Sequence, residues 1–374
     1  MKVLFLIDAQ GGGAMTHILN LAERLPKEKI FPEILFFTEG PSIKEAKKRN
    51  ISTYLILKKG FGLVFFYKLC KYLKKNHHDI LHTHTINANF FGRIAGKISG
   101  VRVLLATVHS HVIDELKGLK KPSIFDHIRY RIDIFLSRWN RCLVVVSEAI
   151  REQLIRQGIP ASNIRVIENG VDTNKFRPNL QIGLDVRKEL DIPEEAKVVG
   201  IIGRIVPLKN HDLFLRSAEK ISKNRKDVYF LIVGNGPLLN SIRNYAKSLG
   251  LSDRVIFTGW RTDIERIIPA LDMLVLCSQV EGHNIVTLEA LACGKPVIGT
   301  DVRGIHTMIK HGENGMLVPV DNSTALAKAI LYLIGNPQIA ERMGETGRNY
   351  VVNKYSADYM ISAYLKLYQE MGIL

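Results

Sequence analysis

The chain has 374 residues, of which 46% are hydrophobic and 24% are charged, and it carries a formal net charge of +16. This composition excludes a disordered chain, and the length exceeds what one hydrophobic core usually supports, so we expect two domains. The longest strongly apolar run, Phe61–Tyr67, is far shorter than the ~20 residues of a membrane-spanning helix, which excludes an integral membrane protein.

Short apolar runs alternate with helical patterns, the order typical of βαβ units in a parallel sheet. In the first half we predict strands at Lys2–Asp8, Glu33–Phe37, Thr53–Leu57, Asp79–His84, Arg102–Val108, Cys142–Val146 and Ile164–Ile167. In the second half we predict strands at Lys197–Gly203, Val228–Gly234, Arg254–Thr258, Met273–Cys277, Pro296–Gly299 and Met316–Val318. Continuous apolar strands imply helices on both faces, so each half is predicted to be a doubly wound α/β domain.

The polar segment Asn169–Pro193 interrupts this rhythm. We therefore place the domain junction after Asp172, with domains at residues 1–172 and 173–355, followed by an amphipathic helix from Ser356 to Leu374. Ligands of open α/β sheets bind at the carboxyl ends of the strands. We expect the site in a central cleft that both domains face.

Glycines follow two predicted strands. Gly11–Gly13 precede the predicted helix Ala14–Leu25, where glycine lets backbone amides approach an anion at a helix N-terminus. Gly234 ends the predicted strand Val228–Gly234, and Asn235 follows it. A loop with these residues would let a base or ribose approach closely. An ordinary tight turn is the alternative in both places.

Arg204 and Lys209 lie on the loop after the strand Lys197–Gly203. A guanidinium can bind two phosphate oxygens at once, and an ammonium supplies a point charge. Their position at a strand's carboxyl end favours an anion site over a solvated surface, which is the alternative.

His109 follows the strand Arg102–Val108 and is expected to face the cleft, with Ser110 and His111 after it. A structural role is equally compatible with a single histidine. We expect such a role for His82 and His84 on the neighbouring strand.

Two carboxylates, Glu281 and Glu289, lie eight positions apart around a predicted helix start near Asn284–Val286. The rise of an α-helix places them on the order of 10 Å apart, on either side of the helix N-terminus. That arrangement suits a sugar nucleotide, with one carboxylate for sugar hydroxyls, one for the ribose diol and the positive helix end for the diphosphate. An amphipathic helix with two exposed glutamates is the alternative.

Several segments together resemble family 4 of the retaining glycosyltransferases over nearly the whole chain. The most specific is EGHNIVTLEALACGKPVIGT, which carries the family's Glu-x7-Glu pattern. Weaker ones occur in the family's order: GGGAMTHILNLAERL, DILHTH, TVHS, VVVSEAI, IENGVDTNKF, GRIVPLKN, LIVGNGP and FTGW.

The resemblance implies the GT-B fold of two Rossmann-like domains, with a C-terminal helix (residues 356–374) that packs back on the first domain. It implies catalytic roles for His109, Glu281, Arg204 and Lys209. It further implies donor binding by Gly12, Gly13, Arg204, Lys209, Gly234, Asn235, Arg261, Thr262, Glu281, His283, Asn284, Ile285 and Glu289. The chain departs from the family at His283 and Asn284, where an aromatic residue and glycine are more frequent, so the donor sugar stays open.

The resemblance implies a retaining transfer from a nucleoside-diphosphate sugar to a glycan or lipid-linked acceptor, in cell-surface polysaccharide or glycolipid synthesis. A UDP-sugar is favoured, with a GDP-sugar as the alternative. No Asp-x-Asp occurs in the chain, so we expect no metal and no other cofactor, with cations stabilising the leaving diphosphate. A GT-B sugar-nucleotide epimerase and a catalytically silent sugar-nucleotide binding protein are the alternative functions.

Residues 1–178 contain 29 Lys and Arg against 15 Asp and Glu, a net charge of +14 out of +16. The positive electrostatic field of such a domain attracts anionic partners. The chain lacks a basic motif interleaved with aromatic residues, so nucleic acid is not the favoured partner. We expect an enzyme of the reducing cytoplasm, since its four cysteines lie in apolar runs, with peripheral attachment to the inner face of the plasma membrane. The stretch Gly60–His78 resembles an interfacial helix; a core helix that buries Leu63, Phe66, Leu69 and Leu73 is the alternative.

Overall fold

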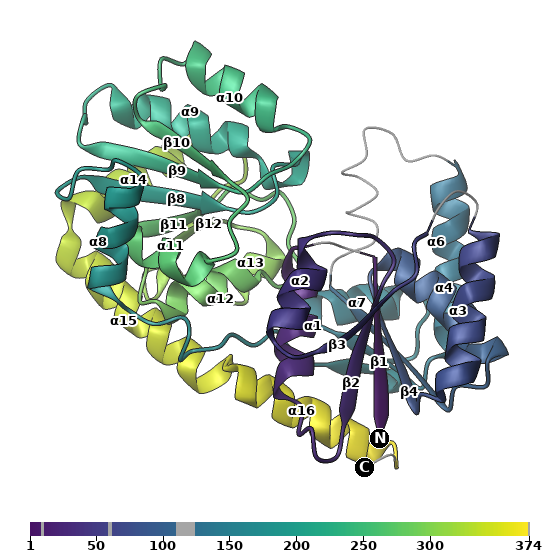
Figure 1. The fold of residues 1–374 in the computed structure, drawn as a ribbon. Coiled ribbons are helices and arrows are strands. Elements are labelled where there is room, and N and C mark those ends of the chain that lie inside the picture. Colours follow the sequence, from purple (N-terminus) through teal and green to yellow (C-terminus); the bar gives the residue numbers. More distant parts are fainter. Residues whose placement is uncertain (9–10, 59–61, 110–123, 373–374) are drawn as a thin grey trace. The chain divides into compact units, whose positions relative to one another are not determined.

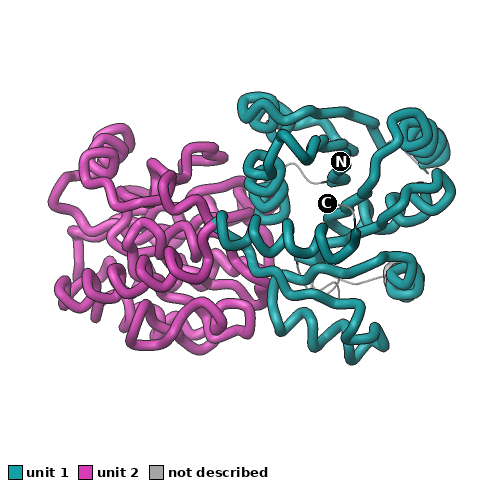
Figure 2. Tube along the Cα trace, turned by 90° about the horizontal axis from the view of Figure 1, so that it is seen from below, with its two compact units in different colours: residues 1–170, 357–374 teal, residues 171–356 magenta. Residues whose placement is uncertain are grey.

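The computed structural model describes residues 1–8, 11–58, 62–109 and 124–372. They form two compact units (Figure 2): residues 1–170 with 357–374 are unit 1, and residues 171–356 are unit 2. The division falls before the predicted junction after Asp172. Val171 belongs to unit 2 because its backbone N–H donates to the Tyr355 carbonyl at 2.9 Å and it forms a β-bridge with Ser356.

Unit 1 is built on a parallel sheet of seven strands in the order β3-β2-β1-β4-β5-β6-β7 (Figure 1). Its strands are β1 (Lys2–Ile7), β2 (Phe31–Phe36), β3 (Ser52–Leu55), β4 (Ile80–His84), β5 (Val103–Val108), β6 (Cys142–Val145) and β7 (Ile164–Val166). Its helices are α1 (Gly13–Arg24), α2 (Pro41–Lys48), α3 (Leu63–Asn76), α4 (Ile86–Ile98), α6 (Ile124–Leu136), α7 (Glu148–Arg156) and α16 (Ala357–Glu370).

The central strand β1 is apolar throughout because helices cover both faces of the sheet. Phe5 packs in a core with residues of α1 and α16, whereas its neighbours Leu4 and Leu6 pack with residues of α3 and α4. The C-terminal helix α16 thus completes the core of unit 1. An ion pair at 2.8 Å between Arg24 and Asp358 also joins α1 to α16.

Helix α3 departs from the predicted core pattern. Leu69 and Leu73 are buried and Phe66 is partly buried, as a core helix requires, but Leu63 is 80% exposed. The side chain of Phe65 takes the core position instead. The first turn of α3 therefore presents apolar surface to solvent.

Unit 2 is built on a parallel sheet of six strands in the order β10-β9-β8-β11-β12-β13. Its strands are β8 (Lys197–Ile202), β9 (Val228–Val233), β10 (Val255–Gly259), β11 (Met273–Leu276), β12 (Val297–Thr300) and β13 (Gly315–Val318). Its helices are α8 (Leu180–Glu189), α9 (His211–Ser222), α10 (Leu239–Ser248), α11 (Ile264–Ala270), α12 (Ile285–Ala292), α13 (Arg303–His306), α14 (Ser323–Gly335) and α15 (Pro337–Lys354).

In each sheet, successive strands are added first toward one edge and then toward the other, so the strand order reverses once. In unit 1 the reversal lies between β1 and β4, and in unit 2 it lies between β8 and β11. At such a point the two following loops diverge and leave room for a ligand at the carboxyl edge. The loops after these four strands are therefore where ligand-binding residues are expected.

Candidate active site

In unit 2 the predicted cations and carboxylate gather around the reversal point. Arg204 and Lys209 lie on the loop that follows β8, and Glu281 lies on the loop that follows β11. Lys209 Nζ forms an ion pair with Glu281 Oε1. The Arg204 side chain is exposed and makes no ion pair with the described residues. The structure thus brings together two groups for which separate ligand contacts were predicted.

Three donors converge on one oxygen of Glu281. Besides Lys209, Ser278 Oγ donates to Glu281 Oε1 at 2.6 Å and Asn284 Nδ2 donates at 2.9 Å. The side chain is only 10% exposed. An ammonium has three N–H donors, so Lys209 keeps two for a ligand, and Oε2 of Glu281 receives none of these three bonds.

Helix α12 begins at the predicted position. Asn284 is its N-cap, since its Oδ1 accepts from the backbone N–H of Thr287 at 3.1 Å while its Nδ2 holds Glu281. The first N–H groups of a helix have no intrahelical partner, which leaves that of Ile285 available to an anion. His283, in the same loop, is buried and its ring lies 5.4 Å from that of Tyr355.

Glu289 lies one turn inside α12 and is only 6% exposed. Burial raises its pKa from 4.5 to about 7, an effect that nearby Glu265 increases and Lys175 opposes. The prediction of an exposed glutamate, which was the alternative to a ligand role, is wrong for this residue. A carboxyl group held in such an environment is typical of functional sites.

Gly234 has a structural reason to be glycine. Its φ is 140°, and a Cβ there would lie 1.9 Å from the carbonyl oxygen of Gly203. The carbonyl of Asn235 accepts from the backbone N–H of Ile205 at 3.0 Å. The loop after β9 therefore supports the loop that carries Arg204.

Arg261 is already engaged by carboxylates. Its guanidinium donates to Asp263 at 2.8 and 2.7 Å and to Glu189 at 2.5 Å, and these bonds raise its pKa. Its charge is thus neutralised locally, whereas its neighbour Thr262 is exposed. Of these two predicted donor-binding residues, Thr262 is the more exposed.

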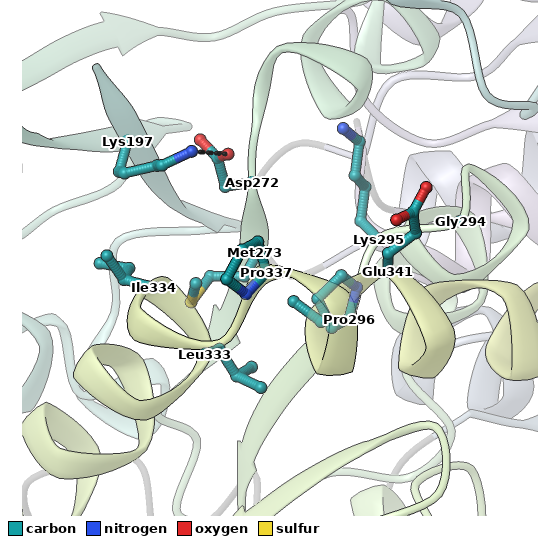
Figure 3. A pocket seen from close by; sticks show the side chains of 11 residues that line it. Lys197, Asp272, Met273, Gly294, Lys295, Pro296, Leu333, Ile334, Pro337 and Glu341 are labelled. Carbon is teal, nitrogen blue, oxygen red and sulfur yellow. Dashed lines mark ion pairs between the residues drawn. The ribbon is translucent and has the colours of Figure 1, made fainter. Parts of the chain in front are cut away.

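A pocket of about 230 Å³ lies at the other edge of this sheet (Figure 3). Lys197 and Met273, at the amino ends of β8 and β11, help to line it, and Lys197 pairs with Asp272 at 3.7 Å. It contains none of the predicted donor-binding residues. The polar groups at the carboxyl edge therefore define the candidate site, and this pocket does not.

In unit 1 the reversal point lies beside the glycine loop. Gly12 has a φ of 81° and precedes α1, whose first residue is Gly13. Asp8, after β1, accepts hydrogen bonds from Thr85 and Asn87, after β4. Thr85 has a φ of 77°, a conformation that is rare and strained for a β-branched residue.

Behind this edge, four buried side chains form a hydrogen-bonded chain. Asn169 Oδ1 accepts from His17 Nδ1 at 2.9 Å, so a neutral His17 must accept at Nε2 from the hydroxyl of Tyr364, 3.0 Å away. Tyr364 then accepts from the hydroxyl of Thr107 at 3.2 Å. The chain joins α1 and β5 to the C-terminal helix.

The chain continues to a second histidine. Thr107, having donated to Tyr364, accepts from His82 Nε2 at 2.8 Å, and His82 Nδ1 lies 3.5 Å from the hydroxyl of Tyr368. In this chain each side chain from Tyr368 to His17 donates one hydrogen bond to the next. That order requires both His82 and His17 to be neutral, because a protonated imidazole has no acceptor nitrogen. Burial lowers the pKa of His17 to about 4 and that of His82 to about 3. His82 therefore has the predicted structural role.

We expect unit 1 to lose stability in mild acid. The folded pKa values of these two histidines lie below the ordinary 6.5, so stability is complete above pH 6.5 and falls as the pH drops towards 4. Each ring costs about 1.4 kcal/mol per pH unit below 6.5, so His17 and His82 together should make unfolding at pH 5 require about 4 kcal/mol less than at pH 7. His84 and His109, whose pKa values are also lowered by burial, add to this loss. The interacting titratable groups are His17, His82, His84, His109, Tyr364 and Tyr368.

Urea denaturation measures this loss. A Trp260→Phe protein leaves Trp139 as the reporter of unit 1. His82→Gln, which keeps a donor for Thr107, should reduce the loss between pH 7 and pH 5 by about 2 kcal/mol, the contribution of one ring. The exposed His77→Gln is the control and should not change it. An unfolding free energy that is equal at both pH values would refute the neutral chain.

His109 follows β5 and retains some exposed surface, and its Nε2 lies 2.9 Å from Nδ1 of His84. Ser110 and His111 lie outside the described residues. Sequence reasoning missed His17, Ser278 and Thr85, because their types carry no signal without their partners. Among the described residues, no group of three or more His, Cys, Asp or Glu is arranged to hold a metal ion.

Comparisons with known proteins agree with this arrangement. The family model for glycosyl transferases group 1 matches residues 184–350, and that for Glycosyltransferase Family 4 matches residues 11–175. The Escherichia coli protein UDP-Gal:alpha-D-GlcNAc-diphosphoundecaprenol alpha-1,3-galactosyltransferase is 30% identical over 329 residues, which cover 87% of this chain and 82% of that protein. The chain belongs to glycosyltransferase family 4.

A second relative is similar over most of its length, and a solved structure shares the fold. The N-acetyl-alpha-D-glucosaminyl L-malate synthase of Bacillus anthracis is 27% identical, over 83% of this chain and 80% of that protein. The crystal structure of Anabaena HepE in complex with UDP and glucose superposes with a TM-score of 0.88 at 22% identity, covering 99% of each chain. The predicted GT-B fold and the enzyme class, a glycosyltransferase, are confirmed.

Proposed function

We propose that this glycosyltransferase moves a sugar, with retention, from a UDP-sugar to a lipid-linked glycan acceptor in cell-surface polysaccharide or glycolipid synthesis. The observation that carries the proposal is the convergence of Arg204, Lys209 and Glu281 with the start of α12 at the reversal point of sheet β8–β13. The Escherichia coli relative, named for UDP-Gal and a diphosphoundecaprenol-linked substrate, supports the donor base and the acceptor class.

The proposed chemistry uses fixed charge. Arg204, the two remaining N–H donors of Lys209 and the Ile285 N–H bind the diphosphate, Glu281 binds a sugar hydroxyl through Oε2, and Glu289 binds the ribose. His109 contacts the transferred sugar. The bond from the anomeric carbon to phosphate breaks while the bond to the acceptor oxygen forms on the same face, and the leaving phosphate takes the acceptor's proton. Positive groups lower this barrier because charge develops on the leaving diphosphate.

Thermal-shift screening against nucleoside diphosphates and their sugars tests the donor. UDP and one or more UDP-sugars should raise the melting temperature, since a ligand at 100 times its dissociation constant adds about 2.7 kcal/mol. Stabilisation by GDP alone would refute the uridine assignment. Transfer should survive a chelator; loss of activity restored by a divalent ion would refute metal independence. Turnover of the sugar nucleotide without any acceptor would favour an epimerase.

A lipid-linked acceptor requires access to a membrane surface. None of the helices in the described part of the chain is both long and apolar enough to cross a bilayer. Two helices of unit 1 nevertheless expose apolar side chains. On α3 they are Leu63, Val64 and Tyr67, at 80, 69 and 66% exposure, and from α6 onward they are Ile128, Ile132, Phe135 and Trp139, at 49, 41, 58 and 39% exposure.

Helix α4 packs against both α3 and α6, and the three helices lie in one layer of unit 1 (Figure 1). Exposed basic side chains occur on α3, on α6 and just after α6: Lys68, Lys71, Lys74, Lys75, Arg131 and Arg138. Each basic residue near an anionic leaflet contributes about 1 kcal/mol. We place the enzyme at the cytoplasmic face of the membrane, in keeping with four free cysteines.

We expect salt-sensitive sedimentation with anionic vesicles and none with zwitterionic vesicles. Tyr67→Asp and Phe135→Asp should each weaken binding, because they place a negative charge in the apolar layer. Tyr359→Asp is the matched control: Tyr359 is 62% exposed, but on α16, which packs with α1. Equal partitioning at low and high salt, or none at low salt, would contradict membrane attachment and favour a freely diffusing acceptor.

A further inference from the structure

His84 and His109 meet at the carboxyl edge of sheet β1–β7. The parallel register places His84, the last residue of β4, opposite Thr107 of β5, and His109 follows two residues later. Nδ1 of His84 lies 2.9 Å from Nε2 of His109, and the ring centroids are 5.2 Å apart. A neutral imidazole has one donor and one acceptor nitrogen. One of these two nitrogens therefore donates to the other.

The two possible directions differ in where the remaining N–H lies. If His109 donated, the proton of His84 would sit on Nε2, which is buried and has no hydrogen-bond partner among the described residues. An unsatisfied buried N–H costs about 1–3 kcal/mol. If His84 donates, the remaining N–H is at Nδ1 of His109, an atom that is also buried and without a partner among the described residues. The ring of His109, unlike that of His84, keeps some exposed surface at the edge where a ligand would bind.

The surroundings keep the pair neutral. The ring of His82 lies 4.4 Å from that of His84, and the ring of His17 lies 5.0 Å from that of His109. Burial, together with these neighbouring imidazoles, lowers the pKa of both His84 and His109 well below the ordinary value. Both rings are consequently neutral at neutral pH, so the pair holds two protons, one of which lies in the bond between the rings.

We infer that His84 is a positioning residue that donates from Nδ1 to Nε2 of His109 and thereby presents the Nδ1–H of His109 to a hydroxyl oxygen of the donor sugar. The inference rests on the proposed function, because it takes His109 as the residue that contacts the transferred sugar. His84, the second histidine of the DILHTH segment, thus contributes to donor recognition in addition to packing in β4. Free nucleoside diphosphate lacks the transferred sugar, so its binding should not depend on His84.

Three variants test the inference. His84→Leu removes the donor and should lower kcat/KM for the sugar nucleotide about tenfold, the loss expected for one neutral hydrogen bond. His84→Asn places an amide near the position of Nδ1 and should recover most of that loss. His82→Gln, which alters the neighbouring chain but not the contact with His109, should keep kcat/KM within about twofold. The dissociation constant of UDP should be unchanged in all three.

Nitrogen-15 NMR of labelled histidines reads the tautomer directly. His109 should be protonated at Nδ1 in the parent protein and in His84→Asn, and should lose that preference in His84→Leu. A His109 protonated at Nε2 in the parent protein, or an unchanged kcat/KM in His84→Leu, would overturn the inference. If no sugar nucleotide is turned over, the proposed function fails, whereas the tautomer of His109 still decides the direction of this bond.

Discussion

Lys209→Ala is expected to lower kcat by about 10²-fold or more, and Arg204→Ala by a similar factor. Charge that develops on a leaving diphosphate is stabilised by fixed cations, and removing one such group typically costs 10²- to 10³-fold in rate. Arg204 makes no ion pair with the described residues of unit 2, so its guanidinium is available to the ligand.

Lys209 needs a second substitution, because its removal also leaves Glu281 without its cation. In the Glu281→Gln background that side effect disappears, and Lys209→Ala should still lower kcat markedly. Lys220→Ala, an exposed lysine on α9, is the control and should leave kcat unchanged. Single-turnover kinetics at saturating donor measures the chemical step. Activity that survives the double variant Arg204→Ala/Lys209→Ala would exclude the diphosphate role.

Glu289→Gln should weaken UDP binding while it stabilises unit 2 at alkaline pH. The pKa of Glu289 is raised from 4.5 to about 7, so the folded state holds its proton longer than the unfolded chain does. The stabilisation from that proton is complete below pH 4.5 and is lost as the pH rises through 7. Glutamine avoids the loss, which amounts to about 3 kcal/mol at pH 8.

Binding and stability then move in opposite directions. An ionised carboxylate that accepts from a ribose hydroxyl is worth about 1.5–3 kcal/mol, so titration calorimetry should show UDP binding weakened by at least tenfold. Glu281→Ala is the matched comparison and should lower turnover with little change in UDP affinity. In a Trp139→Phe protein, Trp260 reports urea unfolding of unit 2. Full UDP affinity in Glu289→Gln would remove the ribose assignment.

The parts of this fold that depend on local pattern could be predicted from the sequence. Strand ends agreed within about two residues because continuous apolar runs bounded by glycine and polar residues have few alternatives. The start of α12 followed from Asn284, whose side chain caps the helix as its residue type favours. The two glutamates around that start were recognisable from spacing alone.

The contacts between distant residues could not be predicted in this way. Lys209 and Glu281 are 72 positions apart, and His17 and Tyr364 are 347 apart, so no local pattern connects them. The core-helix alternative for Gly60–His78 was wrong about Leu63, because helical periodicity fits Leu63 and Phe65 to the core about equally well. Strand register and packing between elements determine which residues meet and which face of a helix is buried, and neither can be read from a single sequence.

The position of α16 in unit 1 has a consequence for how the chain is made. Tyr364 and Tyr368 complete the core of unit 1, yet they leave the ribosome after all of unit 2. At about 5–20 residues per second, synthesis of the intervening segment takes roughly 10–40 s. During that interval β1, β4 and β5 lack one of the helices that cover one face of their sheet, and apolar side chains of that face are open to chaperones. A released chain that ends before Ala357 should therefore have a protease-sensitive first domain and a resistant second domain.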